Sequence, residues 1–188
     1  MGQAKTLTDR ELKKVLDYVA VHKHAARNRA MLMTTYLAGL RVSEVASLRC
    51  GDVLAADGTI KLEIQLSAEQ TKGGYARTVF VGDRLKKELT AYVKTLKRPD
   101  PSLALFSTQK RDHFSASTLC QHFHWLYRHA GIDGASSHSG RRTFITTLAS
   151  KGVSVRVLAA LAGHRNIATT MVYIDASDDM KRAAVQLI

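Results

Sequence analysis

The spacing of apolar and polar residues predicts helices through most of the chain. Thr8 and Glu11 form a Thr-x-x-Glu capping signal, and apolar residues then recur at helical spacing to about His22. Gly39 follows a second helical stretch, and glycine readily takes the left-handed conformation that ends a helix. On the same spacing, further helices are expected over residues 25–38, 43–48, 83–96, 117–130, 139–150, 155–162 and 167–173, and from residue 178 onward.

One central stretch changes period. Apolar residues alternate with polar ones over residues 60–66 and, less regularly, over 75–81, which predicts two strands. The connection between them contains Lys72 and two glycines, so we expect an antiparallel hairpin with Lys72 near its turn. The predicted fold class is α+β, a mostly helical domain with a small antiparallel sheet, and residues 1–188 are expected to form one domain.

Charge adds a class of partner to this picture. The 188 residues include 28 Lys and Arg against 16 Asp and Glu, a formal net charge of +12. Such an excess favours binding to a polyanion, because phosphate contacts release counterions. The basic residues occur along the whole chain rather than in one tail, so folding must assemble any phosphate-binding surface.

The sequence also argues against several classes of protein. Its two cysteines are too few for a disulfide framework, and no apolar run is long enough for a secretory signal or a membrane span. We therefore expect a cytoplasmic protein with no membrane association.

The last third of the chain holds the densest cluster of reactive side chains. His138 and Arg141 are three residues apart at an expected helix start, where both can face an anion. Gly163 is placed to end a helix and release His164 into a turn, and Tyr173 follows on the next short helix. Two histidines, an arginine and a tyrosine are therefore able to converge.

Two upstream residues complete a chemical scheme. Arg41 begins a helix with Glu44 one turn on, where the Glu44 carboxylate is expected to hold the Arg41 guanidinium. Lys72 sits in the glycine-flanked hairpin turn. Attack of a phenol on a phosphodiester needs guanidiniums on the nonbridging oxygens, a base for the phenolic proton and an acid for the departing 5′-oxygen. The chain supplies all of these, and the scheme requires neither metal nor cofactor.

The order of these motifs resembles the catalytic domain of the tyrosine recombinase, or phage integrase, family. The resemblance extends from about Thr6 to Ala176 and includes Gly-Leu-Arg, Thr-Lys-Gly, His-Ser-Gly-Arg, Ala-Gly-His and the tyrosine nine residues later. Residue by residue, it implies two phosphate clamps (Arg41, Arg141), a general acid (Lys72), a proton-transfer histidine (His138), a phosphate hydrogen-bond donor (His164) and a nucleophile that forms a 3′-phosphotyrosine (Tyr173).

The resemblance also implies partners. The substrate would be double-stranded DNA, bound by a homotetramer of a protein that is monomeric in solution. A host DNA-bending protein is a candidate accessory factor. The tail from Asp178 would dock on a neighbouring subunit. Family members usually carry an N-terminal core-binding domain, which we do not expect here, and two short motifs beginning at His24 and Gly163 are similar to the fimbrial phase-switch invertases.

Two positions depart from the family pattern. Gly140 and Ala162 stand where leucine is usual. Both are packing positions, so the departures concern local rigidity rather than chemistry.

Other interpretations stay open at this point. Residues 153–173 also resemble a helix-turn-helix, so a noncatalytic DNA-binding regulator is the main alternative. A basic RNA-binding protein is a further alternative. A topoisomerase is also left open, because it would use the same chemistry. Individually, each site residue has an ordinary structural explanation, but six in the required order argue against coincidence. A zinc site is disfavoured, because on a helix Cys120 and His124 share a face while His122 points away, and Trp125 is expected in the core.

Overall fold

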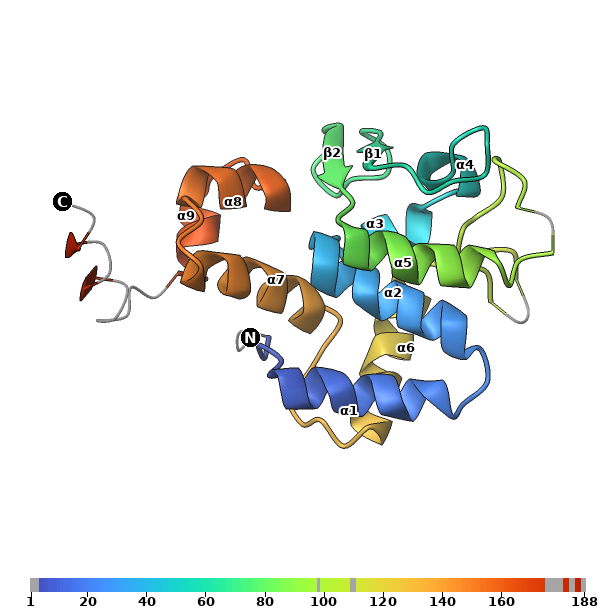
Figure 1. Ribbon diagram of the computed structural model, residues 1–188, viewed down its shortest axis with the longest axis horizontal. Coiled ribbons are helices and arrows are strands. Elements are labelled where there is room, and N and C mark those ends of the chain that lie inside the picture. Colours follow the sequence, from blue (N-terminus) through green and yellow to red (C-terminus); the bar gives the residue numbers. More distant parts are fainter. Residues whose placement is uncertain (1–3, 98, 109–110, 175–180, 183–184, 187–188) are drawn as a thin grey trace.

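Helix α2 (Ala25–Ala38) lies at the centre of the fold and packs against α1, α3, α5 and α7. The structure is a computed structural model that describes residues 4–97, 99–108, 111–174, 181–182 and 185–186. The other elements, shown in Figure 1, are α1 (Asp9–Ala20), α3 (Val42–Ser47), α4 (Cys50–Val53), β1 (Glu63–Leu66), β2 (Arg77–Phe80), α5 (Asp83–Val93), α6 (Ala116–His129), α7 (Ser139–Ser150), α8 (Val155–Ala162) and α9 (Ile167–Met171).

The central position of α2 follows from its residues. Small and apolar side chains cover most of its surface, and the buried Thr34 and Thr35 satisfy their hydroxyls by donating to backbone carbonyls of the same helix. Helix α1 instead buries a single stripe, because its apolar residues share one face. The predicted capping box at Thr8 is present, and α2 ends at Gly39 with φ of +64°, both as expected.

The predicted hairpin is present, although its strands are shorter than expected. Strands β1 and β2 pair antiparallel, with Glu63 opposite Phe80 and Leu66 opposite Arg77. The prediction of one strand over residues 60–66 is wrong, since Ile60 forms an isolated bridge with Leu54 and only the last four residues pair with β2. The alternating pattern therefore spans two separate pairings.

Other departures are local. The sequence did not predict α4, and α5 ends at Val93 rather than at residue 96. Trp125 was expected in the core, but the residue is 43% exposed. Most of the predicted tail helix from Asp178 lies outside the described residues.

Helices α8 and α9 lie beside α7 at one end of the molecule, away from the bulk of the core (Figure 1). Leu158, Ala159 and Ala162 of α8 are buried, yet the main hydrophobic cluster does not include them. Contacts beyond that cluster must therefore fix α8 relative to the helical body.

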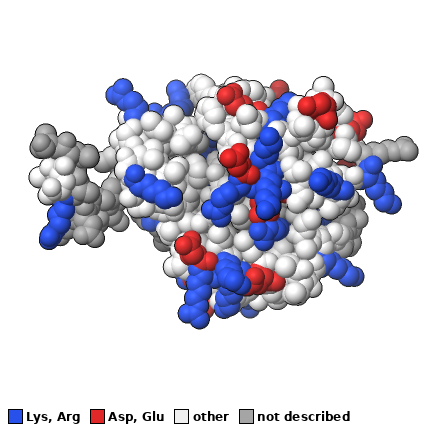
Figure 2. Space-filling model, in the orientation of Figure 1, with Lys and Arg blue, Asp and Glu red and all other residues white. Residues whose placement is uncertain are grey.

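The surface carries mixed charge. Figure 2 shows Lys and Arg side chains spread over one face, with Asp and Glu side chains between them. Within the described part of the chain, no helix is long and apolar enough to cross a membrane.

Candidate active site

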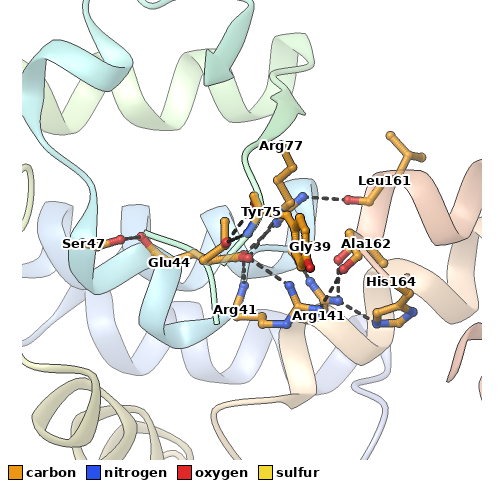
Figure 3. A network of polar contacts seen from close by, with 12 residues as sticks. Gly39, Arg41, Glu44, Ser47, Tyr75, Arg77, Arg141, Leu161, Ala162 and His164 are labelled. Carbon is orange, nitrogen blue, oxygen red and sulfur yellow. Dashed lines mark hydrogen bonds and ion pairs between the residues drawn. The ribbon is translucent and has the colours of Figure 1, made fainter. Parts of the chain in front are cut away.

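Three arginines from separate elements converge on the C-terminal end of α8. Gly163 ends this helix with φ of +62°, and the last carbonyls of a helix have no partner within it. Each of three consecutive carbonyls accepts a hydrogen bond from one guanidinium (Figure 3). The pairs are Arg77 Nη1 with Leu161 O (2.9 Å), Arg141 Nη2 with Ala162 O (2.6 Å) and Arg41 Nη2 with Gly163 O (3.2 Å).

This arrangement has electrostatic consequences. The C-terminal end of a helix carries partial negative charge, so it attracts the three cations. The arginines come from the start of α3, from β2 and from α7, and they therefore tie α8 to the helical body. Gly163 is required at this point, because a Cβ there would lie 2.6 Å from Cδ of Arg77 and the residue has positive φ.

Glu44 is the buried counter-ion of two of these arginines. Its carboxylate has no exposed surface and accepts from Arg41 Nη1 at 2.9 Å and from Arg77 Nη2 at 2.7 Å. Burial opposes the charged form, but the hydrogen bonds and charges of Arg77 and Arg41 outweigh it and lower the pKa of Glu44. The expected pairing of Glu44 with Arg41 is confirmed, whereas Arg77 was not foreseen.

Arg141 lies beneath the surface of the site. The residue is 5% exposed, and besides Ala162 it donates to the Gly39 carbonyl at 2.7 Å and to His164 Nε2 at 2.7 Å. Burial, together with nearby cations, lowers the pKa of Arg141 to about 9, so the guanidinium keeps its charge at neutral pH.

His164 is neutral in this network. Because a guanidinium only donates, Nε2 must accept from Arg141, so the proton is on Nδ1, which donates to the buried Thr170 hydroxyl at 2.9 Å. Burial and the positive charge of Arg141, Arg41 and Arg77 lower the pKa of His164 to about 4. Helix α9 therefore orients the ring through Thr170.

His138 and Lys72 both lie near the arginine cluster. His138 is exposed at the start of α7, where partial desolvation and the charges of Arg141, Lys72 and Arg41 lower its pKa. Lys72, in the β1–β2 connection, lines a cleft of about 580 Å³ together with Arg41 and His164. The structure thus brings these four predicted residues to one place.

Tyr173 follows α9 and is half-buried. Its ring stacks on that of His164, with centroids 6.0 Å apart and planes 20° apart, and the guanidinium of Arg142 lies 5.2 Å from the ring centroid. Tyr173 is thereby adjacent to the arginine cluster, and all six predicted residues belong to one region of the molecule.

This geometry agrees with a family-level comparison. A sequence model described as the phage integrase family matches residues 5–180. The chain belongs to the phage integrase family. Among curated relatives, it is 29% identical over 185 residues to the tyrosine recombinase XerA of Pyrococcus furiosus, covering 97% of this chain and 61% of that protein. The tyrosine recombinase XerD of Mycobacterium leprae is 33% identical over 183 residues, covering 90% of this chain and 56% of that protein.

Solved structures agree on the fold. A crystal structure of XerA recombinase superposes with a TM-score of 0.76 at 24% identity, covering 100% of this chain and 64% of that chain. The Tn1549 transposon integrase in complex with transposon right end DNA gives 0.78 at 20% identity, covering 100% of this chain and 67% of that chain. The chain spans about six-tenths of the length of these curated relatives.

The departure from the integrase family pattern at Gly140 has a packing explanation. A Cβ at Gly140 would lie 2.2 Å from the Thr35 hydroxyl oxygen, so α7 crosses α2 too closely for any side chain. Ala162 is fully buried, and the carbonyl that accepts from Arg141 is its own. Gly140 and Ala162 are therefore both closely packed positions near Arg141.

Sequence reasoning missed three residues of this integrase-family site, namely Arg77, Arg142 and Arg165. Arg77 lies in a predicted strand, whereas Arg142 directly follows Arg141 and Arg165 directly follows His164. Adjacency to a motif is a signal that could have drawn attention to the last two. Arg77 offers no such signal, since its partner Glu44 is 33 residues away.

Two residues of the disfavoured zinc site, Cys120 and His122, have other contacts. Cys120 Sγ lies 3.1 Å from Ser137 Oγ, and His122 Nε2 lies 3.0 Å from Asn28 Oδ1. Among residues whose placement is described, no three His, Cys, Asp or Glu side chains group as metal ligands.

Proposed function

We propose that this domain cleaves and rejoins DNA as a tyrosine recombinase, through a covalent 3′-phosphotyrosyl intermediate on Tyr173. The observation that carries the proposal is the convergence of Arg41, Arg141 and His164 at the end of α8, with Tyr173 stacked on His164. Two charged guanidiniums beside a phenol match the needs of phosphoryl transfer. The chain spans only part of its curated relatives, so we propose its activity, substrate and partners from the geometry of the site.

In the proposed reaction, the Tyr173 oxygen attacks phosphorus while the bond to the 5′-oxygen breaks. Arg41 and Arg141 bind the nonbridging oxygens and stabilise the charge that develops on them. His138, whose lowered pKa favours the neutral ring, accepts the phenolic proton, and Lys72 donates a proton to the departing 5′-oxygen. The tyrosyl phosphodiester conserves the energy of the broken bond.

The second half of the reaction reverses the first. A 5′-hydroxyl from a partner strand attacks the phosphotyrosine, gives its proton to Lys72 and releases the phenol, which regains its proton from His138. Atoms and charges therefore balance without ATP, a metal or another cofactor. The proposed role of His164 is to accept from Arg141 until a phosphate enters; the ring proton then moves from Nδ1 to Nε2, so that Nε2 can donate to that phosphate.

The assembly is part of the proposal. Exchange between two duplexes requires more than one active site, which favours a homotetramer on double-stranded DNA, with monomers in solution and the tail from Asp178 docking on a neighbour. Participation of a host DNA-bending protein and the single-domain organisation stay predictions. The finer resemblance to fimbrial phase-switch invertases is weaker, because the relatives described above carry Xer names.

The decisive experiment uses suicide substrates, which are duplexes with a nick beside the cleavage site, drawn from DNA that flanks the gene. We expect wild type to form a covalent protein–DNA band and Tyr173→Phe to form none, because the phenolic oxygen that forms the phosphate ester is lost. Tyr75→Phe is the matched control, since it removes a hydroxyl beside the same cleft and should retain the band. An adduct of equal intensity with Tyr173→Phe contradicts the proposal.

A noncatalytic DNA-binding regulator remains the second candidate. Helices α8 and α9 do form a helix, a glycine turn and a second helix, but α9 has five residues and its Thr170 side chain points to His164. A regulator predicts sequence-specific binding with no covalent band for any variant, so the same experiment separates the two functions.

A further inference from the structure

The guanidinium of Arg165 lies directly over the ring of Tyr75, with Cζ 4.2 Å from the ring centroid. Arg165 belongs to the turn between α8 and α9, whereas Tyr75 belongs to the β1–β2 connection. Both residues are exposed, and both line the cleft that contains Lys72. The cation–π contact therefore joins opposite walls of the cleft.

Tyr75 is tightly coupled to the segment that carries Lys72. The Tyr75 backbone N–H donates to the Thr71 hydroxyl at 3.1 Å, and that hydroxyl donates to the Tyr75 carbonyl at 2.8 Å. A further backbone bond from Gly74 to Thr71 closes the turn at 3.2 Å. Residues 71–75 therefore move as one unit, and whatever fixes Tyr75 also fixes Lys72.

Arg165 is similarly coupled to His164, which precedes it in the chain. His164 is held by Arg141 and Thr170, so the backbone at Arg165 has a defined position relative to the arginine cluster. Within the described structure, the side chains of residues 71–75 reach the α8–α9 turn through the contact between Tyr75 and Arg165. Without this contact, the next side chain that joins the hairpin to α8 is Arg77, which donates to the Leu161 carbonyl.

We propose that Arg165 and Tyr75 are positioning residues that hold the Lys72 loop against the α8–α9 turn, so that the lysine faces the scissile phosphate. This inference rests on the proposed function, in which Lys72 protonates the 5′-oxygen. Arg165 acts through Tyr75 and Lys72 and has no contact of its own with the reacting atoms in this scheme. The loss of an exposed cation–π pair should lower the cleavage rate about twofold to fivefold.

The test replaces each partner and changes the leaving group. Arg165→Leu and Tyr75→Leu should both slow adduct formation on the suicide substrate, whereas Tyr75→Phe, which keeps the ring, should react like wild type. Arg156→Leu is the charge-matched control, because Arg156 is an exposed arginine of α8. The double variant Arg165→Leu/Tyr75→Leu should be no slower than either single variant.

A second substrate tests the donation of a proton to the leaving group by itself. Replacing the bridging 5′-oxygen by sulfur gives a thiolate leaving group that departs without a proton, so the step no longer needs a general acid. We expect this substrate to restore the rates of Arg165→Leu, Tyr75→Leu and Lys72→Met to that of wild type. If Lys72→Met is rescued but Arg165→Leu is not, the positioning role is wrong while the proposed function stands; if Lys72→Met is not rescued, the assigned role of Lys72 fails.

Hydrogen exchange provides a readout that needs no DNA. Arg165→Leu should increase amide exchange in residues 71–76, and Arg156→Leu should not, because only the former releases the loop. Unchanged exchange in Arg165→Leu, or a loss of DNA affinity that accounts for its slower cleavage, overturns the inference.

Discussion

Arg77 donates hydrogen bonds to both carboxylate oxygens of Glu44, from Nε to Oε1 at 3.2 Å and from Nη2 to Oε2 at 2.7 Å. The carboxylate has no exposed surface, and it also accepts from the backbone and side chain of Arg41. A strand of the hairpin and the start of α3 are thus joined through one buried anion. Arg41 and Arg77 are therefore coupled through Glu44, so the position of Arg41 depends on Arg77.

Replacing Glu44 by Gln tests this dependence. The amide cannot compensate two buried guanidiniums, and breaking a buried ion pair typically costs about 3–5 kcal/mol, so we expect a loss near the lower end of that range. Urea unfolding at pH 7 measures it, with Glu69→Gln, at an exposed position, as the control. A difference below about 1 kcal/mol contradicts the assignment of Glu44 as the counter-ion.

The pH dependence of that loss has a definite sign. Because the pKa of Glu44 is lowered in the folded protein, its contribution is fully present above the unfolded-state pKa and is lost as pH falls through the folded-state pKa. The difference in stability between wild type and Glu44→Gln should therefore shrink on acidification below pH 4. A difference that grows in this range contradicts the assignment.

The contact between Gly140 and Thr35 yields a prediction on packing. Gly140→Ala places a methyl group 2.2 Å from the Thr35 hydroxyl oxygen, so α7 must shift from α2. Overpacking of this kind costs about 1–3 kcal/mol. Thr35→Ala removes the obstructing oxygen, and the double variant should recover part of the loss, as a thermodynamic cycle from thermal unfolding would show. Full additivity of the two changes contradicts the interpretation.

The contrast between Gly140 and Arg77 indicates what sequence can and cannot reveal. Periodicity and turn chemistry are local, and they predicted the caps at Thr8 and Gly39, the hairpin and the helical order. The candidate reactive residues were predicted because their motifs are local too. The pairing of Glu44 with Arg77, the overlap of Gly140 with Thr35 and the exposure of Trp125 depend on which elements pack together, which local pattern does not encode.

The neutral state of His164 can be measured directly. Its pKa is lowered from 6.5 to about 4 by burial and by Arg141, so the ring should stay neutral, with the proton on Nδ1, between pH 5.5 and 8. Nitrogen NMR of the labelled protein follows this tautomer. By linkage, the contribution of the neutral ring to stability is lost as pH falls from 6.5 toward 4. Titration of His164 near pH 6.5 contradicts the network.

Arg142 offers a test of how Tyr173, the proposed nucleophile, is held. Its Nε donates to the Thr6 hydroxyl at 3.1 Å while its guanidinium lies over the Tyr173 ring, so the segment before α1 is linked to Tyr173 through one side chain. Arg142→Met should slow adduct formation about threefold to thirtyfold, because the cation–π contact is lost, with DNA affinity nearly unchanged.

Two further variants make this prediction specific. Thr6→Val removes the hydrogen bond but leaves the guanidinium, so it should slow adduct formation less than Arg142→Met does. Arg128→Met removes the same charge from an exposed arginine of another helix, α6, and should have no effect on the rate. Equal effects of Arg128→Met and Arg142→Met would mean that total charge, rather than contact with Tyr173, controls the reaction.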